Sequence, residues 1–282
     1  MVDKSELDLS AEHIQSVCGT DPVAIAILLG HGLEGLMEGL QDVQSFHFRD
    51  LPGFPVKSEP SQNEGVLTIG VLEGARVAFL HGYGSYSDTG ILNSMALPFE
   101  TLTVLGCTTL AMATGVTSVN ADIIPGHIIS VVDHINLSGL NPLVGAASEG
   151  GFMSLAEAYD PRLQRRLRRA TVSAGVSFQD AVMMWFPGLT FATAAEVKVA
   201  RTLGADVIGH SFIPELIVAR RIGLRVVMFG VVAGYSAGFA NGNPTHASFR
   251  AGSQQGVISL RRLWRAFLRV KEEAWSGQTS QP

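Results

Sequence analysis

The stretch GADVIGHSFIPELIVARRIGLRV, at residues 204–226, decides the fold class of this chain. Its first part, residues 205–210, is a short apolar run typical of a buried strand, and residues 213–222 have the apolar spacing of a helix. A second apolar run follows at residues 224–232. A strand, a helix and another strand in this order predict an α/β protein.

The same alternation of apolar runs and helical patterns continues through the rest of the chain. Further strands are predicted at 23–29, 66–72, 75–81, 109–114, 127–135 and 180–186, and further helices at 91–105, 154–175, 192–203 and about 245–274. Because several strands are apolar throughout, helices are expected on both faces of the sheet. We therefore expect one domain over residues 1–282, with an N-terminal extension at 1–20, a surface loop or lid at 139–153 and a flexible tail at 275–282.

Composition and charge narrow the function classes. The chain has 282 residues, of which 46% are hydrophobic and 16% charged, so a large core or buried subunit contacts are expected. The net charge of −5 argues against a nucleic-acid partner. The basic run at 162–169 is interpreted as a solvated helical face or a subunit contact. Cys18 and Cys107 lack the spacing of a metal site or disulfide framework, and no cofactor or metal is expected.

Nothing in the sequence indicates a membrane segment. No apolar run approaches the roughly 20 residues that span a bilayer. The polar, acidic start of the chain also lacks the basic and apolar regions of a signal peptide. A cytoplasmic protein is expected.

A glycine-bracketed loop, Gly30–Gly32, follows the apolar run 23–29 and carries His31 at its centre. Loops of this kind bring backbone N–H groups to an anionic ligand. In α/β folds, ligands gather where strands end and loops begin. The other expected strand ends that could line a site lie at 81–90, 113–120, 187–192, 209–211 and 233–238.

Four ordered blocks resemble the trimeric purine nucleoside phosphorylases and their methylthioadenosine phosphorylase relatives. They are LLGHGLEGL at 28–36, VVDHINLSGLNPL at 131–143, FPGLTFATAAE at 186–196 and the stretch at 204–226. The resemblance extends over about 22–270 and implies a nucleoside-phosphorylase-like mixed sheet, a distorted barrel, flanked by helices. It also implies a homotrimer whose site binds orthophosphate beside a nucleoside, stabilises a ribosyl cation and protonates the leaving purine.

The phosphate positions implied by the resemblance are altered. The hydroxyl of the first loop is replaced by His31, the arginine of the second loop by Tyr83 and its histidine by Ser85, whereas Ser211 is retained. Loss of the guanidinium alone is expected to weaken phosphate binding by about one to two powers of ten. Asp88, nearby in the sequence, adds unfavourable charge.

The purine and sugar positions differ as well. Ala192 stands where the family has the glutamate that holds the base, and Gly234 where it has an asparagine or aspartate. His210 replaces the methionine under the ribose, whereas Phe191 and His246 match family residues. We interpret these differences as a pocket that is retained from the family but has fewer polar groups. Such a pocket favours a less polar ligand.

The leading hypothesis is an enzyme of specialised metabolism that acts on a small molecule without phosphate, by acid/base chemistry such as cyclisation, elimination, isomerisation or hydrolysis. The candidate catalytic residues are His31, His210 and Ser85. The candidate binding residues are Tyr83, Tyr86, Thr114, Gly115, Phe191, Ala192, Ser211, Gly234, Tyr235 and His246. One alternative is glycosidic-bond cleavage of a modified purine nucleoside, with or without phosphate. Another is a non-catalytic binding subunit. A metal held by His31, His210 and Asp88 has no support from spacing.

Overall fold

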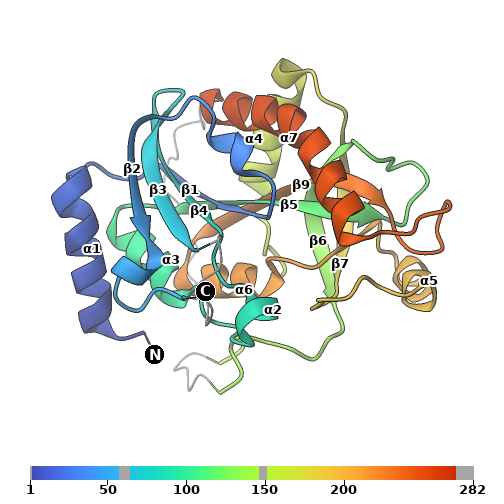
Figure 1. Cartoon of the computed structure of the whole chain (residues 1–282), viewed down its shortest axis with the longest axis horizontal. Helices are drawn as coiled ribbons and strands as arrows, with labels where there is room; N and C mark the ends of the chain where they lie inside the picture. Colours follow the sequence, from blue (N-terminus) through green and yellow to red (C-terminus); the bar gives the residue numbers. More distant parts are fainter. Residues whose placement is uncertain (1, 57–63, 146–150, 271–282) are drawn as a thin grey trace.

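Strands and helices alternate along most of the chain, as the sequence predicts (Figure 1). The structure, a computed structural model, describes residues 2–56, 64–145 and 151–270. The elements in chain order are α1 (Lys4–Cys18), β1 (Ile25–Leu29), η1 (Glu34–Met37), β2 (Gln41–His47), η2 (Phe48–Asp50), β3 (Val66–Leu72), β4 (Ala75–His81), α2 (Tyr86–Thr89), α3 (Ala96–Val104), β5 (Thr109–Ser118), β6 (Ile128–Asn136), α4 (Pro161–Ala174), β7 (Phe178–Trp185), α5 (Ala194–Thr202), β8 (Val207–Gly209), α6 (Ile213–Ile222), β9 (Arg225–Tyr235) and α7 (His246–Arg269).

The sheet is mixed and closes partly on itself. Its strand order is β2-β3-β4-β1-β5-β8-β7-β6-β9, with an additional pairing between β5 and β9. The strands β5, β8, β7, β6 and β9 therefore form a closed barrel, and β1, β4, β3 and β2 extend from it through β5. Both parallel pairs, such as β1–β5, and antiparallel pairs, such as β6–β9, occur. This confirms the predicted mixed sheet with a distorted barrel.

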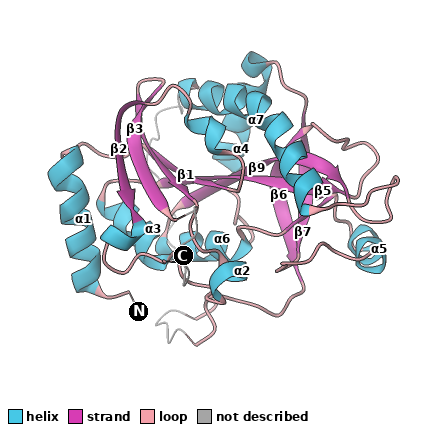
Figure 2. Ribbon diagram, in the orientation of Figure 1, coloured by secondary structure: helices cyan, strands magenta, loops and turns pink. Residues whose placement is uncertain are grey.

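Helices cover both faces of the extended part of the sheet, with α4 and α7 on one side and α3 and α6 on the other (Figure 2). Alternate residues of β1 reach the two sides, as the period of a strand requires. Ile25, Ile27 and Leu29 pack in the cluster that includes α4 and α7. Ala26 and Leu28 pack in the cluster that includes α1, α3 and α6. The burial of every residue in β1 explains its uninterrupted apolar sequence.

Several predicted boundaries were wrong, and five elements were not predicted: α1, η1, β2, η2 and α2. The helix expected at 154–175 begins at Pro161, because the Asp160 side chain caps it and proline suits the first helical position. The helix expected at 91–105 begins at Ala96. Strand β2 was missed because six of its seven residues are exposed at the edge of the sheet, and helix α1 because it lies within the presumed extension. The expected tail at 275–282, and residues 146–150 of the expected lid, lie outside the described residues.

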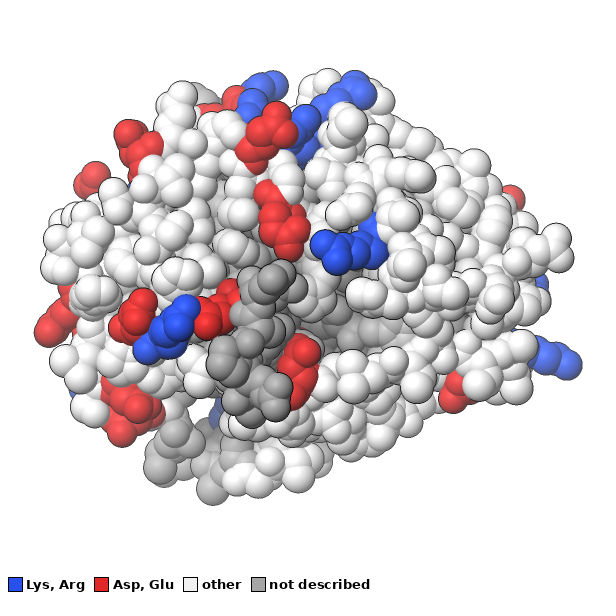
Figure 3. All heavy atoms as spheres, viewed as in Figure 1, with Lys and Arg blue, Asp and Glu red and all other residues white. Residues whose placement is uncertain are grey.

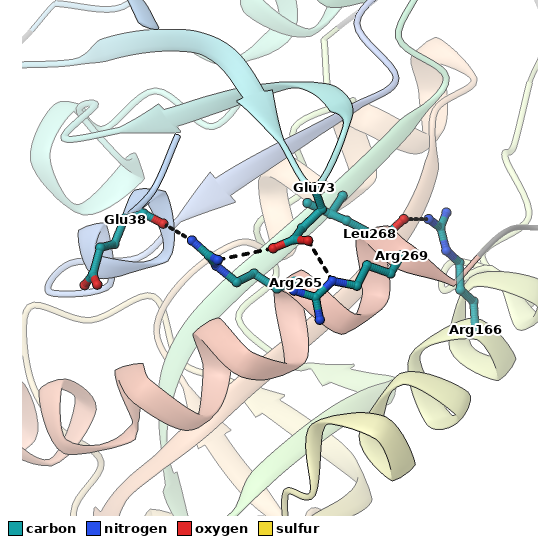
Figure 4. A network of polar contacts seen from close by, with 6 residues as sticks. All are labelled: Glu38, Glu73, Arg166, Arg265, Leu268 and Arg269. Carbon is teal, nitrogen blue, oxygen red and sulfur yellow. Dashed lines mark hydrogen bonds and ion pairs between the residues drawn. The ribbon is translucent and has the colours of Figure 1, made fainter. Parts of the chain in front are cut away.

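The end of α7 is held by a polar network that centres on the β3–β4 turn (Figure 4). Glu73 in this turn accepts hydrogen bonds from Arg265 Nη1 at 3.2 Å and Arg269 Nε at 2.6 Å. Arg265 also donates to the backbone carbonyl of Glu38, and Arg166 of α4 donates to the carbonyl of Leu268. The network therefore connects α7 to η1, to the β3–β4 turn and to α4.

Basic and acidic side chains lie next to one another over the α7 region in Figure 3, where Arg261 pairs with Glu38 and Arg265 with Glu73. Arg166, within the basic run, donates through Nε to the carbonyl of Phe267 at 3.0 Å, and Arg168 pairs with Asp180. Arg165 and Arg169 are exposed. In the described part of the chain, no helix is both long and apolar enough to cross a membrane.

Candidate functional site

The loop after β1 lies against the start of the barrel. Gly30 donates its backbone N–H to the carbonyl of Ala113 at 2.8 Å. A side chain at Gly30 would bring a Cβ atom within 3.1 Å of that carbonyl oxygen, so the close approach depends on glycine. Gly32, with φ of +83°, faces the side chains of Arg250 and Gln254 in α7. His31 is exposed on this turn.

A cleft of about 230 Å³ lies between the ends of β5 and β9 and the start of α7. It is lined by Thr117, Ala233, Gly234, Tyr235, Ala240, Asn241, Gly242, Asn243, Pro244, Ser248 and Phe249. All of these residues are uncharged, and Tyr235 and Phe249 supply the aromatic surface. Gly234 and Tyr235, both predicted site residues, therefore lie in one cleft.

A row of three rings leads away from this cleft. The Phe249 ring of α7 lies 5.7 Å from the Phe191 ring, centroid to centroid, and Phe191 lies 5.5 Å from the His210 ring in an edge-to-face arrangement. Phe191 precedes α5, and His210 directly follows β8, so the row joins three separate segments. It brings the predicted residues Phe191 and His210 into contact.

His210 has a defined tautomer. Its Nδ1 atom lies 3.1 Å from the carbonyl oxygen of Phe186, and because a carbonyl can only accept, Nδ1 carries the proton. The Nε2 atom is buried and has no hydrogen-bond partner within the described part of the chain. Burial lowers the pKa of His210, so the ring is neutral at neutral pH. Nε2 is therefore a free hydrogen-bond acceptor or proton acceptor.

Tyr83 lies in the core. Its hydroxyl donates to Glu215 Oε1 at 2.9 Å, with only 5% of Tyr83 and 4% of Glu215 exposed. Burial raises the pKa of Glu215, and burial together with the nearby Glu215 raises that of Tyr83 well above its usual value. Glu215 Oε2 has no hydrogen-bond partner among the described residues. The Tyr83 hydroxyl is thus occupied by a core carboxyl group.

The hydroxyl of Ser85 is also occupied within the protein. Ser85 Oγ donates to Asp88 Oδ2 at 2.8 Å, and the same oxygen accepts the backbone N–H of Ser85 at 2.9 Å. These bonds cap the short helix α2, where Tyr86 is half-buried. Ser87 then donates to the carbonyl of Gly188, which joins α2 to the loop next to His210.

The family of the chain follows from its similarity to known proteins. The sequence profile of the Phosphorylase superfamily matches residues 24–269. The chain belongs to the Phosphorylase superfamily.

The relatives agree with this assignment over nearly the whole chain. Purine nucleoside phosphorylase 1 of Geobacillus stearothermophilus is 28% identical over 271 residues, 95% of this chain and 98% of the relative. Purine nucleoside phosphorylase of Bos taurus is 32% identical over 216 residues, 74% of each chain. The crystal structure of Schistosoma mansoni purine nucleoside phosphorylase in complex with adenosine has a TM-score of 0.86 and 26% identity, and covers 95% of this chain and 98% of its own. The nucleoside-phosphorylase-like fold is confirmed.

In this member of the Phosphorylase superfamily, the other predicted site residues are not among the described residues that line the cleft. Thr114 is buried in β5, and its neighbour Gly115 leaves room for Ser253 and Phe249, since a Cβ there would lie 2.4 Å from Ser253 Oγ. Ala192 is buried and Ser211 half-buried. His246 is exposed at the first residue of α7.

Sequence reasoning missed Phe249, although it lines the cleft and touches Phe191. A signal was present, because Phe249 lies three residues after His246 and shares its side of a helix. In addition, the described residues contain no group of three or more His, Cys, Asp or Glu side chains that could hold a metal ion.

Proposed function

We propose that this superfamily member is an enzyme that acts on a small, weakly polar molecule without using phosphate. The main support for this proposal is the hydrogen bond from the Tyr83 hydroxyl to the buried Glu215 carboxyl group. Tyr83 stands where the resemblance implies the arginine that binds phosphate. A neutral hydroxyl that is already donated to a carboxyl group offers a phosphate dianion neither charge nor a free proton.

The nearby groups make this position still less suitable for an anion. Ser85 stands at the implied phosphate histidine and donates its hydroxyl proton to Asp88. The Asp88 carboxylate would repel a dianion, and no cation has replaced the guanidinium at these two positions. Both changes support a reaction in which phosphate is not a substrate.

The neutral His210 ring supports acid/base chemistry. Nε2 of His210 is a proton acceptor, and its Nδ1–H bond to Phe186 fixes the ring orientation. His31, exposed on the loop after β1, is the proposed second proton-transfer group. Cyclisation, elimination, isomerisation and hydrolysis all require such proton transfers.

A second candidate function is glycosidic-bond cleavage of a modified purine nucleoside. The similarity to purine nucleoside phosphorylases over nearly the whole chain favours it. So does the retention of Phe191 and Ser211, which match residues that the resemblance implies for base and phosphate. In this alternative His31 would be the anion-binding group.

One assay separates the two candidates. The full chain is incubated with inosine, adenosine and methylthioadenosine, with and without phosphate, and free base is measured against a purine nucleoside phosphorylase as positive control. We expect no phosphate-dependent release of base. Rapid release that requires phosphate would overturn the proposed function, and release without phosphate would favour hydrolysis of a nucleoside.

A further inference from the structure

Half of the basic side chains of this protein lie on two helices that pack together. Helix α4 has five arginines and α7 has five, and neither helix contains an aspartate or a glutamate. The whole chain has 20 basic residues, so the ten basic residues outside these helices are set against all 25 acidic ones. The two helices touch where the guanidinium carbon of Arg166 lies 4.3 Å from the centre of the Phe267 ring. Positive charge is therefore concentrated on one part of a protein that is negative overall.

The outward side of α4 carries a row of arginines. Its buried residues are leucines and alanines, and its exposed arginines are Arg162, Arg165, Arg168 and Arg169, here called the α4 arginine face. Arg162, Arg165 and Arg169 are spaced by three and four residues, which places them along one side of the helix. At about 1.5 Å per residue, this row is about 10 Å long.

Two members of the α4 arginine face have no ion pair with a described residue. Arg168 pairs with Asp180, whereas no carboxylate in the described part of the chain lies within ion-pair distance of Arg162 or Arg165. Like charges three or four residues apart repel one another and destabilise a helix. Negative charge supplied by a bound molecule would remove this repulsion.

The size and surroundings of the α4 arginine face favour a protein segment over a nucleic acid or a lipid bilayer. A long duplex or a membrane extends far beyond a row of about 10 Å, and would meet the acidic side chains that predominate elsewhere on the protein. Val172, which is 84% exposed, follows Arg169 by three residues and so continues the same side of α4. An exposed apolar side chain beside the charges suits contact with another protein. The planar guanidinium groups also match the two oxygens of a carboxylate.

We propose that the α4 arginine face binds an acidic segment of another protein, whose carboxylates pair with Arg162 and Arg165 and whose apolar side chain packs on Val172. None of the described residues that line the cleft belongs to α4, so this contact goes beyond the proposed function and does not depend on it. Ion pairs between exposed groups are individually weak and are screened by salt. The complex is therefore transient and sensitive to ionic strength.

A synthetic peptide of three Glu-Glu-Leu repeats tests the proposal, with three Gln-Gln-Leu repeats as the uncharged control. Binding of each labelled peptide to the full chain is measured by fluorescence anisotropy at low and at physiological salt. We expect the acidic peptide to bind about tenfold or more tightly than the control at low salt, and its affinity to fall as salt increases. A DNA duplex and phosphatidylglycerol vesicles, titrated in parallel, should bind more weakly than the acidic peptide.

The double variant Arg162→Gln and Arg165→Gln removes two charges from the α4 arginine face. It should bind the acidic peptide about fivefold or more weakly than the wild type. The matched control is the double variant Arg49→Gln and Arg221→Gln, which removes the same charge from exposed positions on η2 and α6. This control should keep the wild-type affinity within about twofold, because those positions lie outside the face.

Three results would overturn the proposal: equal affinity of the wild type for the two peptides, equal losses in the two double variants, or tighter binding of DNA or vesicles than of the acidic peptide. If the Arg162→Gln and Arg165→Gln variant does not fold, amide NMR of the wild-type chain with the acidic peptide decides. Shifts that centre on α4 support the proposal, and shifts that leave α4 unaffected overturn it.

Discussion

The hydroxyl of Tyr83 donates a hydrogen bond to the carboxyl group of Glu215, at 2.9 Å, across 132 positions of the sequence. It connects the loop after β4 to the first turns of α6. Both residues are buried, so they form a contact within the core. Tyr83 stands at the position where the resemblance implies a phosphate-binding arginine. The same bond therefore affects both the stability of the fold and the chemistry of the site.

Removing this hydroxyl should destabilise the protein. In Tyr83→Phe, both oxygens of the buried Glu215 carboxyl lack a side-chain partner, and we expect the free energy of unfolding to fall by about 1–3 kcal/mol. Urea denaturation of the two proteins measures the difference. Tyr86→Phe, at a half-buried tyrosine on α2, serves as the control and should change stability much less. Equal stability of Tyr83→Phe and wild type would contradict the account of this pair.

The carboxyl of Glu215 should make stability depend on pH in a particular direction. Burial raises its pKa above the ordinary value of 4.5, so the folded protein holds the proton more tightly than the unfolded chain. Its contribution to stability is complete below pH 4.5 and is lost as pH rises through the raised pKa.

The variant Glu215→Gln isolates this effect, because glutamine keeps the shape and does not titrate. The free energy of unfolding of the wild type, relative to Glu215→Gln, should decrease as pH rises from about 4.5 towards neutrality. Denaturant titrations at a series of pH values measure the difference. A difference that stays constant over this range would mean that Glu215 has an ordinary pKa in the folded protein.

Restoring the phosphate-binding side chains that the resemblance implies at positions 83 and 85 should restore phosphate binding. The double variant Tyr83→Arg and Ser85→His introduces a guanidinium that can also pair with Glu215, and it should bind phosphate about 10- to 100-fold more tightly than wild type. The increase in melting temperature with phosphate concentration reports the binding. Tyr83→Gln and Ser85→Asn, which add polar groups without charge, provide the control. If phosphate raises the melting temperature of the charged variant no more than that of this control, groups other than residues 83 and 85 decide whether phosphate binds.

The Glu73 network predicts a modest, salt-sensitive contribution to stability. The Arg269 hydrogen bond is the main cause of the lowered pKa of Glu73, but the Arg269 side chain is 62% exposed, so solvent screens the pair. Glu73→Gln should lower the free energy of unfolding by about 0.5–1 kcal/mol at low ionic strength and by less at high salt. Urea denaturation at two salt concentrations tests this. A loss that does not change with salt would indicate that packing, and not charge, holds the end of α7.

The fold could be predicted from the sequence because its signals are local. The apolar run of β1 and the strand–helix–strand pattern of β8, α6 and β9 are each readable within about ten residues. Strand β2 lacks such a signal, since its residues face solvent at the sheet edge and its pairing with β3 is a contact with a later segment. Closure of the barrel by β5 and β9 was expected only through the resemblance.

The site could be predicted only in part, because its contacts join distant segments. His210 and Phe191 could be placed from their positions at strand and loop ends, and they meet as a ring pair. The hydrogen bond from the Tyr83 hydroxyl to Glu215 could not be predicted from the residues around either position. The two residues are far apart in the sequence, and only folding buries them and brings them together. For the same reason the fixed tautomer of His210 depends on a carbonyl that precedes it by 24 positions.

Direct titration of phosphate into the wild-type chain tests the central claim most closely. Calorimetry, with the double variant Tyr83→Arg and Ser85→His as the comparison, reports whether the anion occupies the site. The account predicts no saturable binding to the wild type at millimolar phosphate and saturable binding to the variant. Saturable binding to the wild type at micromolar phosphate would contradict the account.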